Sequence, residues 1–144
     1  RGFSLAEDGD TVEDYITELR KAGIVVSLFI DPTEENVSLA HELMADFVEL
    51  NTSRYSEANS YDEEINSLRE IERAAHLGSN KGLGIAVGHG LNYRNVANIA
   101  RIVPVEEFSI GHAIIARSIF VGLTQAVQEM RNEIFNIKDN LDVK

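Results

Sequence analysis

Hydrophobic positions along the chain switch between helical spacing and short continuous runs. Apolar residues three or four apart predict helices over residues 11–22, 31–44, 60–77, 92–100 and 112–136. Short runs rich in β-branched or other apolar residues predict strands over residues 24–30, 47–50, 84–87 and 108–110. The order is therefore one helix followed by four strand–helix units, which predicts a parallel sheet with helices packed over it.

Capping residues mark the predicted helix boundaries. Side chains that can accept a hydrogen bond from a first-turn N–H precede four helices: Thr11, Asp31, Ser60 and Asn92. Asp14 and Glu63 complete capping boxes with Thr11 and Ser60. Glycines that suit a helix end follow the first and third helices: Gly23 and Gly78. The second helix is expected to bury Val37, Ala40, Leu43 and Met44. The last helix is expected to bury Ile115, Ile119, Leu123, Val127, Met130 and Ile134.

Four strand–helix units fit two architectures. A doubly wound sheet suits a chain of this length, whereas a (β/α)8 barrel needs about 250 residues, so the chain would supply roughly half of one. Length favours the doubly wound sheet. Polar residues within or at the ends of the strands, Ser27, Glu49 and Ser109, suit a barrel mouth better, because central doubly wound strands are apolar on both faces.

Composition narrows the class of protein. The sequence has no Cys, which excludes a disulfide scaffold, a thiolate metal site and a Cys nucleophile. Its 24 acidic and 13 basic residues give a formal charge of −11, which argues against a nucleic-acid surface. No apolar run reaches the length of a membrane span and no signal-peptide pattern occurs, so we expect a cytoplasmic protein with no membrane partner. The chain begins at Arg1 without Met, so we expect a piece of a longer protein.

Two Gly-His pairs follow neighbouring strands. Gly88-His89-Gly90 comes at the carboxyl end of a strand, where α/β proteins place ligands, and a flanked His can serve as general acid or base. Gly111-His112 comes at the next strand end and opens a helix, whose free N–H groups favour an anion. Each could equally be an ordinary turn, but two on adjacent strand ends favour a functional site.

Weaker candidates lie on the same rim. Glu49 could meet a substrate or pair with Arg54 or Arg94. The polar loop at 51–60 could hold a hydroxylated ligand or be solvated. Patterns for metal binding, dinucleotides and nucleotide phosphates are absent from the sequence, so we expect no metal site.

Three segments together resemble one family. Val-Ser-Leu-Phe-Ile-Asp at 26–31, Val-Gly-His-Gly-Leu-Asn-Tyr at 87–93 and Phe-Ser-Ile-Gly-His-Ala-Ile-Ile-Ala-Arg-Ser at 108–118 are similar to pyridoxine 5'-phosphate synthase. The resemblance runs over essentially the whole chain and implies the C-terminal half of a (β/α)8 TIM barrel. Residues 1–144 would then be part of a single domain whose N-terminal half is absent from the sequence.

The resemblance also implies an activity. The family condenses 3-amino-2-oxopropyl phosphate with 1-deoxy-D-xylulose 5-phosphate, giving pyridoxine 5'-phosphate, phosphate and water, as a homo-octamer without metal or organic cofactor. By motif, His89 matches the proton donor and Gly90 a substrate-binding glycine. Gly111 and His112 match the pair that binds the aminoketone phosphate, and Glu49 and Thr52 match a substrate loop.

The sequence departs from the family in two ways. The loop that usually reads Glu-x-His-Thr-Gly reads Glu49-Leu50-Asn51-Thr52-Ser53, and an Asn at 51 cannot titrate. The family's other catalytic His and Glu and its Arg-rich phosphate loop are missing, so we expect the isolated chain to be inactive. The alternatives are a non-catalytic phosphate-binding half-barrel that self-associates and, last, a doubly wound binding or signalling domain.

Overall fold

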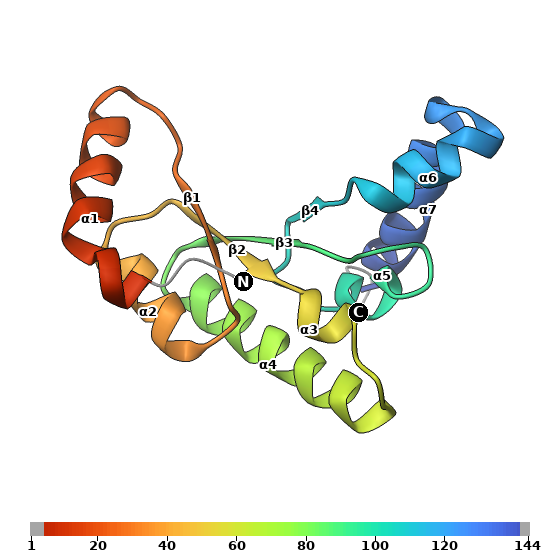
Figure 1. The fold of residues 1–144 in the computed structure, drawn as a ribbon, viewed down its shortest axis with the longest axis horizontal. Helices are drawn as coiled ribbons and strands as arrows, with labels where there is room; N and C mark the ends of the chain where they lie inside the picture. Colours follow the sequence, from red (N-terminus) through yellow and green to blue (C-terminus); the bar gives the residue numbers. More distant parts are fainter. Residues whose placement is uncertain (1–4, 142–144) are drawn as a thin grey trace.

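The structure, a computed structural model, describes residues 5–141 and the side chains of residues 12–139. Its elements follow the predicted alternation (Figure 1). The strands are β1 (Ser27–Ile30), β2 (Phe47–Asn51), β3 (Gly84–Gly88) and β4 (Glu107–Ser109). The helices are α1 (Leu5–Lys21), α2 (Glu34–Glu42), α3 (Ser53–Ser56), α4 (Tyr61–Asn80), α5 (Val96–Ala100), α6 (His112–Val121) and α7 (Leu123–Leu141).

The four strands form one parallel sheet in the order β1-β2-β3-β4. A doubly wound sheet reverses its strand order at a switch point, and this sheet does not. Right-handed crossovers that all advance in one direction place their helices on one face, as in a barrel. Figure 1 shows α2 and α4 below the sheet, with α1 and the α6–α7 pair rising at its two sides. The fold is therefore a half-barrel, and the doubly wound sheet that length favoured is wrong.

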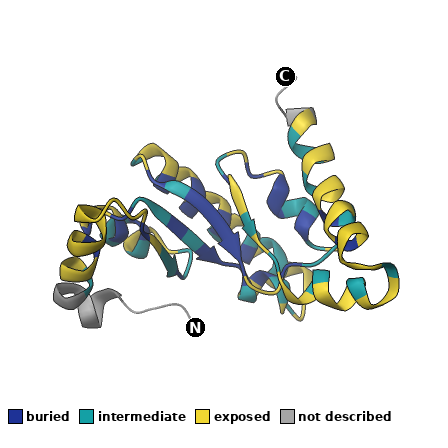
Figure 2. Cartoon of the chain, turned by 90° about the horizontal axis from the view of Figure 1, so that it is seen from above, coloured by how far each residue is buried: buried dark blue, intermediate teal, exposed yellow. Residues whose placement is uncertain are grey.

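Side chains alternate between the two faces of the sheet. Val48, Leu50, Ile85 and Val87 point towards the helices and have no exposed surface. They join the buried residues of α2 and α4 in one hydrophobic core, and Figure 2 shows this buried centre in dark blue. The intervening residues of β2 and β3 face the opposite side, which corresponds to the interior of a barrel.

Three of the predicted helix starts are wrong, including Asn92, because α5 begins only at Val96, after Asn95. The first helix already begins at Leu5, so Thr11 lies inside α1 and does not cap it. Thr33, rather than Asp31, caps α2: its side chain accepts a hydrogen bond from the N–H of Asn36. Both Asp31 and Thr33 can cap a helix, so the sequence alone does not decide between them. The contact of Asp31 with Asn51 leaves Thr33 as the cap of α2.

The predicted ends of two helices also need correction. Gly23 follows α1 with φ of 74°, as expected. Met44, predicted to be buried, follows α2 with φ of 64° and is 61% exposed, because the chain turns there into β2. Gly78 does not end α4, which continues to Asn80. A Cβ at Gly78 would lie 2.6 Å from Cδ1 of Ile85, so this glycine permits close packing of helix on sheet.

The predicted last helix is two helices. Gly122, with φ of 82°, separates α6 from α7, which fold back against each other. Met130 is buried as predicted, but α6 buries no residue and its predicted face is exposed. Figure 2 shows much of this pair in yellow. Among the described side chains of the pair, the most exposed apolar ones are Ile115, Ile119, Phe120 and Leu123. Val127, predicted to be buried, is exposed as well.

Three smaller differences concern loops. Residues 24–26 precede β1 because the neighbouring strand begins only at Phe47. The 51–60 loop contains α3 and buries Asn51, Thr52 and Tyr55, so it is not a solvated loop. Asn92 makes a turn ahead of α5 by accepting hydrogen bonds from the N–H groups of Arg94 and Asn95. None of the helices in residues 5–141 is long and apolar enough to cross a membrane.

Candidate functional site

His89 lies at the carboxyl end of β3 in an uncommon backbone conformation. Its φ is 83°, and that of Gly90 is 75°. Left-handed φ is disfavoured for residues with a Cβ, and in ordered proteins it is concentrated at sites where surrounding contacts hold it. The side chain is exposed at the strand end. The turn therefore presents an accessible imidazole at the edge where barrel enzymes place their chemistry.

Hydrogen bonds hold the three carbonyl groups of this turn. The Thr52 hydroxyl lies 2.8 Å from the Gly88 oxygen and 2.6 Å from the His89 oxygen. The Thr52 N–H donates to the Gly88 oxygen at 2.8 Å. The Ser56 hydroxyl lies 3.3 Å from the His89 oxygen, and the Asn95 amide donates to the Gly90 oxygen at 3.2 Å. Side chains from two segments, Thr52 and Ser56 at α3 and Asn95 before α5, thus fix one tight turn.

Glu49 lies across Gly88 on the barrel-interior face. A Cβ at Gly88 would be 2.2 Å from Oε1 of Glu49 and 3.0 Å from Cβ of Ser109. Only glycine at this position lets the carboxylate lie flat against β3, one residue from His89. The structure does not pair Glu49 with Arg54, which instead bonds Glu70 at 3.1 Å. Glu49 has no hydrogen bond or ion pair among the described residues, so its carboxylate is available to a ligand.

Asn51 joins the ends of two strands. Its amide donates to Oδ1 of Asp31 at 2.9 Å, and its Oδ1 accepts from the N–H of Ser53 at 3.0 Å. The residue is buried. Because Asp31 is engaged by Asn51, Thr33 caps α2 in its place. Asn51 therefore has a structural part in this chain, fixing β1 to β2 and leading the chain into α3.

Gly111 and His112 lie at the neighbouring strand end, as predicted. Gly88 of β3 pairs with Ser109 of β4, so His89 and Gly111 follow adjacent strands at the same edge. Gly111 is the N-cap of α6 and His112 its first residue, and no side chain caps this helix start. A Cβ at Gly111 would meet nothing within 4 Å. The start of α6 is open to an anion, which the helix dipole would stabilise.

Ionisable side chains near the site make hydrogen bonds that hold its loops and the α6–α7 pair. Burial raises the pKa of Tyr55, whose hydroxyl donates to the Asn95 oxygen at 2.8 Å. On the α6–α7 pair, Arg117 donates to both carboxylate oxygens of Glu129, at 2.8 and 3.2 Å. These bonds lower the pKa of Glu129, and a further bond from Gln125 adds to the effect. Tyr93 ties the His89 loop to α7 by donating to the Ala126 oxygen.

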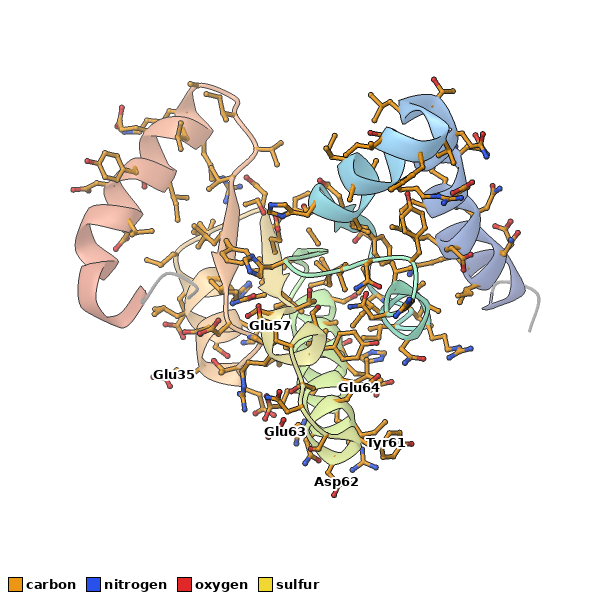
Figure 3. The ribbon with its side chains drawn as sticks, turned by 45° about the vertical axis from the view of Figure 1, so that its right-hand side comes forward. Glu35, Glu57, Tyr61, Asp62, Glu63 and Glu64 are labelled. Carbon is orange, nitrogen blue, oxygen red and sulfur yellow. The ribbon has the colours of Figure 1, made fainter. Side chains whose placement is uncertain are left out.

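A large surface hollow lies elsewhere. It measures about 810 Å³ and is lined by residues of the α3–α4 connection and of α4, including Arg54, Glu57, Glu63 and Arg73. Figure 3 shows Glu57 beside α3 and Glu63 and Glu64 at the start of α4. Basic and acidic side chains alternate in this hollow, so it has no single preferred charge. Among the described residues, no group of three His, Asp or Glu side chains could hold a metal ion.

The fold and the site define a class first. A parallel half-barrel with an accessible His and an uncapped helix start at one strand edge is typical of TIM-barrel enzymes. Comparison with known families then gives the particular one. The model of the pyridoxal phosphate biosynthesis protein PdxJ matches residues 1–136, and the chain belongs to this family.

Similar proteins carry one name. A pyridoxine 5'-phosphate synthase from Geobacter sulfurreducens is 47% identical over 129 residues, which cover 90% of this chain and 54% of that protein. Those from Chlorobium chlorochromatii and Blochmanniella pennsylvanica are 48% and 42% identical, and the matches cover 90% and 92% of this chain and 54% of each relative. The chain therefore spans about half the length of the curated relatives it matches.

Sequence reasoning missed the contacts that build the site. It named Glu49, Thr52, His89 and Gly90 separately, and the structure brings them together at the ends of β2 and β3. The alternation of Glu49 and Asn51 along β2 was a usable signal, because residues two apart share a face. The left-handed φ of His89 left no such signal, since the flanking glycines suggest that they alone supply the turn.

Proposed function

We propose that the intact protein is a pyridoxine 5'-phosphate synthase. It would condense 3-amino-2-oxopropyl phosphate with 1-deoxy-D-xylulose 5-phosphate, releasing phosphate and water. Membership of the PdxJ family and the names of the similar proteins support this activity. The observation that supports it for this chain is the His89 turn, held at the carboxyl end of β3 beside the carboxylate of Glu49, which has no partner among the described residues.

Each candidate residue has a part in this proposal. His89 would donate a proton during the condensation and dehydration steps, because its imidazole is exposed on a fixed turn. Gly90 would allow the substrate to approach the backbone. Gly111 and His112 would bind the aminoketone phosphate at the start of α6. Glu49, with Thr52 behind it, would face the substrate from β2.

The reaction needs more groups than the described residues offer. Imine formation, repeated proton transfer and dehydration require several acids and bases, each of which contributes about 10²–10⁴ in rate. We therefore propose that the isolated 144-residue chain is inactive and that the assembled enzyme, a cytoplasmic homo-octamer, supplies the rest of the site. Formation of pyridoxine 5'-phosphate by the isolated chain would refute this part.

Substitution of His89 tests the activity. In the full-length protein, His89→Ala should lower kcat at least about 100-fold while the protein stays folded, because a positioned proton donor is lost. His41→Ala is the matched control, since His41 is an exposed residue of α2. Turnover of His89→Ala equal to that of the control would remove His89 from the mechanism.

A second candidate is a non-catalytic phosphate-binding half-barrel that self-associates. Two observations favour it: in residues 5–141, β1 and β4 each pair with one strand only, and α6 buries no residue. Exposed strand edges and apolar faces favour association. Sedimentation of the isolated chain separates the two candidates, because a folded monomer of 16.0 kDa contradicts a self-associating half-barrel.

A further inference from the structure

We propose that Thr52 is a positioning residue for His89. Its buried hydroxyl would hold the left-handed backbone of His89 and thereby set the direction of the imidazole. The effect on turnover rests on the proposed function, whereas the effect on the backbone rests on the geometry of the turn alone.

The conformation of His89 needs contacts to hold it. A residue with a Cβ disfavours positive φ, because the Cβ approaches a carbonyl oxygen. Among the described residues, Met44 is the only other non-glycine with positive φ, and it lies at a helix end. His89 instead lies between two glycines, which have no Cβ to restrict the backbone of the turn to one region. Contacts outside the tripeptide must therefore maintain its conformation.

Thr52 is the contact best placed to do so. Its side chain has no exposed surface, so its hydroxyl cannot exchange this contact for water. That hydroxyl lies within 2.8 Å of the carbonyl oxygens on both sides of the His89 Cα, those of Gly88 and His89. Because a hydroxyl has one proton, it donates to the nearer His89 oxygen, while the Thr52 N–H donates to the Gly88 oxygen. Thr52 thus holds both of the peptide planes that define φ and ψ of His89. Ser56 reaches only the His89 oxygen, at 3.3 Å.

Thr52 itself is rigidly placed. Its N–H donates to the Gly88 oxygen at 2.8 Å, which extends the pairing of β2 with β3 by one residue. The position of the hydroxyl is therefore set by the sheet and not by the mobile end of a long side chain. A small error in the placement of a proton donor can reduce a rate strongly. The hydrogen bonds of Thr52 therefore fix the position of the imidazole relative to the sheet.

The first test is spectroscopic. Thr52→Val keeps the shape of the side chain and removes the hydroxyl, whereas Thr52→Ser keeps the hydroxyl and removes a methyl group. In the full-length protein, the strong intraresidue NOE between the amide and Hα of His89, a mark of positive φ, should weaken in Thr52→Val and persist in Thr52→Ser. An unchanged NOE in Thr52→Val would overturn the proposal.

The second test is kinetic. Thr52→Val should lower kcat about 10-fold to 100-fold with KM changed much less, and Thr52→Ser should restore kcat to within about twofold. Thr33→Val is the matched control: it removes a capping hydroxyl from α2, so it should lower stability and leave kcat unchanged. Equal kcat in Thr52→Val and Thr33→Val would overturn a positioning role.

The two tests separate this proposal from the proposed function. If His89→Ala leaves turnover intact, the assigned activity fails, and the His89 NOE in Thr52→Val still decides whether Thr52 holds the turn. If His89→Ala abolishes turnover and Thr52→Val retains it, His89 keeps its part and Thr52 loses the one proposed for it.

Discussion

At the strand ends, the size of single side chains decides which groups can lie close together. Gly88 has no turn to make, since it is the last residue of β3, but a side chain there would collide with Glu49. His89, in contrast, has a side chain in a conformation that usually calls for glycine. Gly88 thus leaves space for the carboxylate of Glu49, and His89 keeps its side chain in a backbone conformation that disfavours a Cβ. Both features indicate that the positions of Glu49 and His89 are important.

A double-mutant cycle tests the contact between Gly88 and Glu49. We expect Gly88→Ala to lower the free energy of unfolding by about 1 kcal/mol, because the new Cβ displaces the carboxylate. In a Glu49→Ala background the same substitution should cost less, since the displaced group is gone. Urea denaturation of the four proteins measures both values. Equal costs in the two backgrounds would mean that the clash lies elsewhere, for example with Ser109.

At the scale of the elements, the sequence predicted the alternation well and the boundaries less well. Every predicted strand is present, because short apolar runs between glycines or acidic residues leave little choice. The errors at Asp31 and Gly78 share one cause. Each residue suits a helix end by its own chemistry, but contacts from distant segments decide whether the helix ends there. Gly122 was missed because apolar spacing continues across it.

Replacement of Gly78 shows how packing overrides local preference. Alanine is favoured over glycine inside a helix by about 1 kcal/mol. Here the added Cβ would press on Ile85, which is fully buried, and overpacking costs about 1–3 kcal/mol. We therefore expect Gly78→Ala to destabilise the protein by about 1 kcal/mol in urea denaturation. Ser79→Ala, on the exposed side of the same turn, should change stability little, and a stabilised Gly78→Ala would contradict the packing argument.

The α6–α7 pair depends on pH through Glu129. Its bonds with Arg117 lower the pKa of the Glu129 carboxyl below the ordinary value of 4.5. The ion pair therefore stabilises the folded state above that value, and the stabilisation is lost as the pH falls through the lowered pKa. We expect Glu129→Gln to reduce the melting temperature slightly at neutral pH.

The pH series supplies the control for this prediction. The melting temperatures of wild type and Glu129→Gln should converge as the pH falls through the lowered pKa of Glu129, because the protonated carboxyl is then neutral like the amide of Gln. Glu72→Gln replaces an exposed carboxylate without a partner among the described residues, and we expect no comparable loss at neutral pH. A deficit of Glu129→Gln that persists at low pH would show that the residue acts through packing instead.

On the scale of the whole molecule, the half-barrel has a stable centre and weakly supported sides. The core lies between the sheet and the helices α2 and α4, whereas α6 contributes no buried residue. The 144 residues carry a formal charge of −11, so their overall field would not attract the phosphorylated substrates of the proposed function. Under that proposal the substrates would be held locally, by backbone N–H groups such as those at the start of α6, a helix that buries none of its residues.

Hydrogen exchange of the isolated chain tests whether α6 is locally less stable than the central strands. Amides of β2 and β3 should exchange only through global unfolding, because both strands are paired on each side and their helix-facing residues are buried. Amides of α6 should exchange at least about tenfold faster through local opening, since its separation from the rest exposes little additional apolar surface. A matched series over protein concentration is needed, because association would cover α6 and slow its exchange. Protection of α6 equal to that of β3 in a dilute monomer would contradict this order of stability.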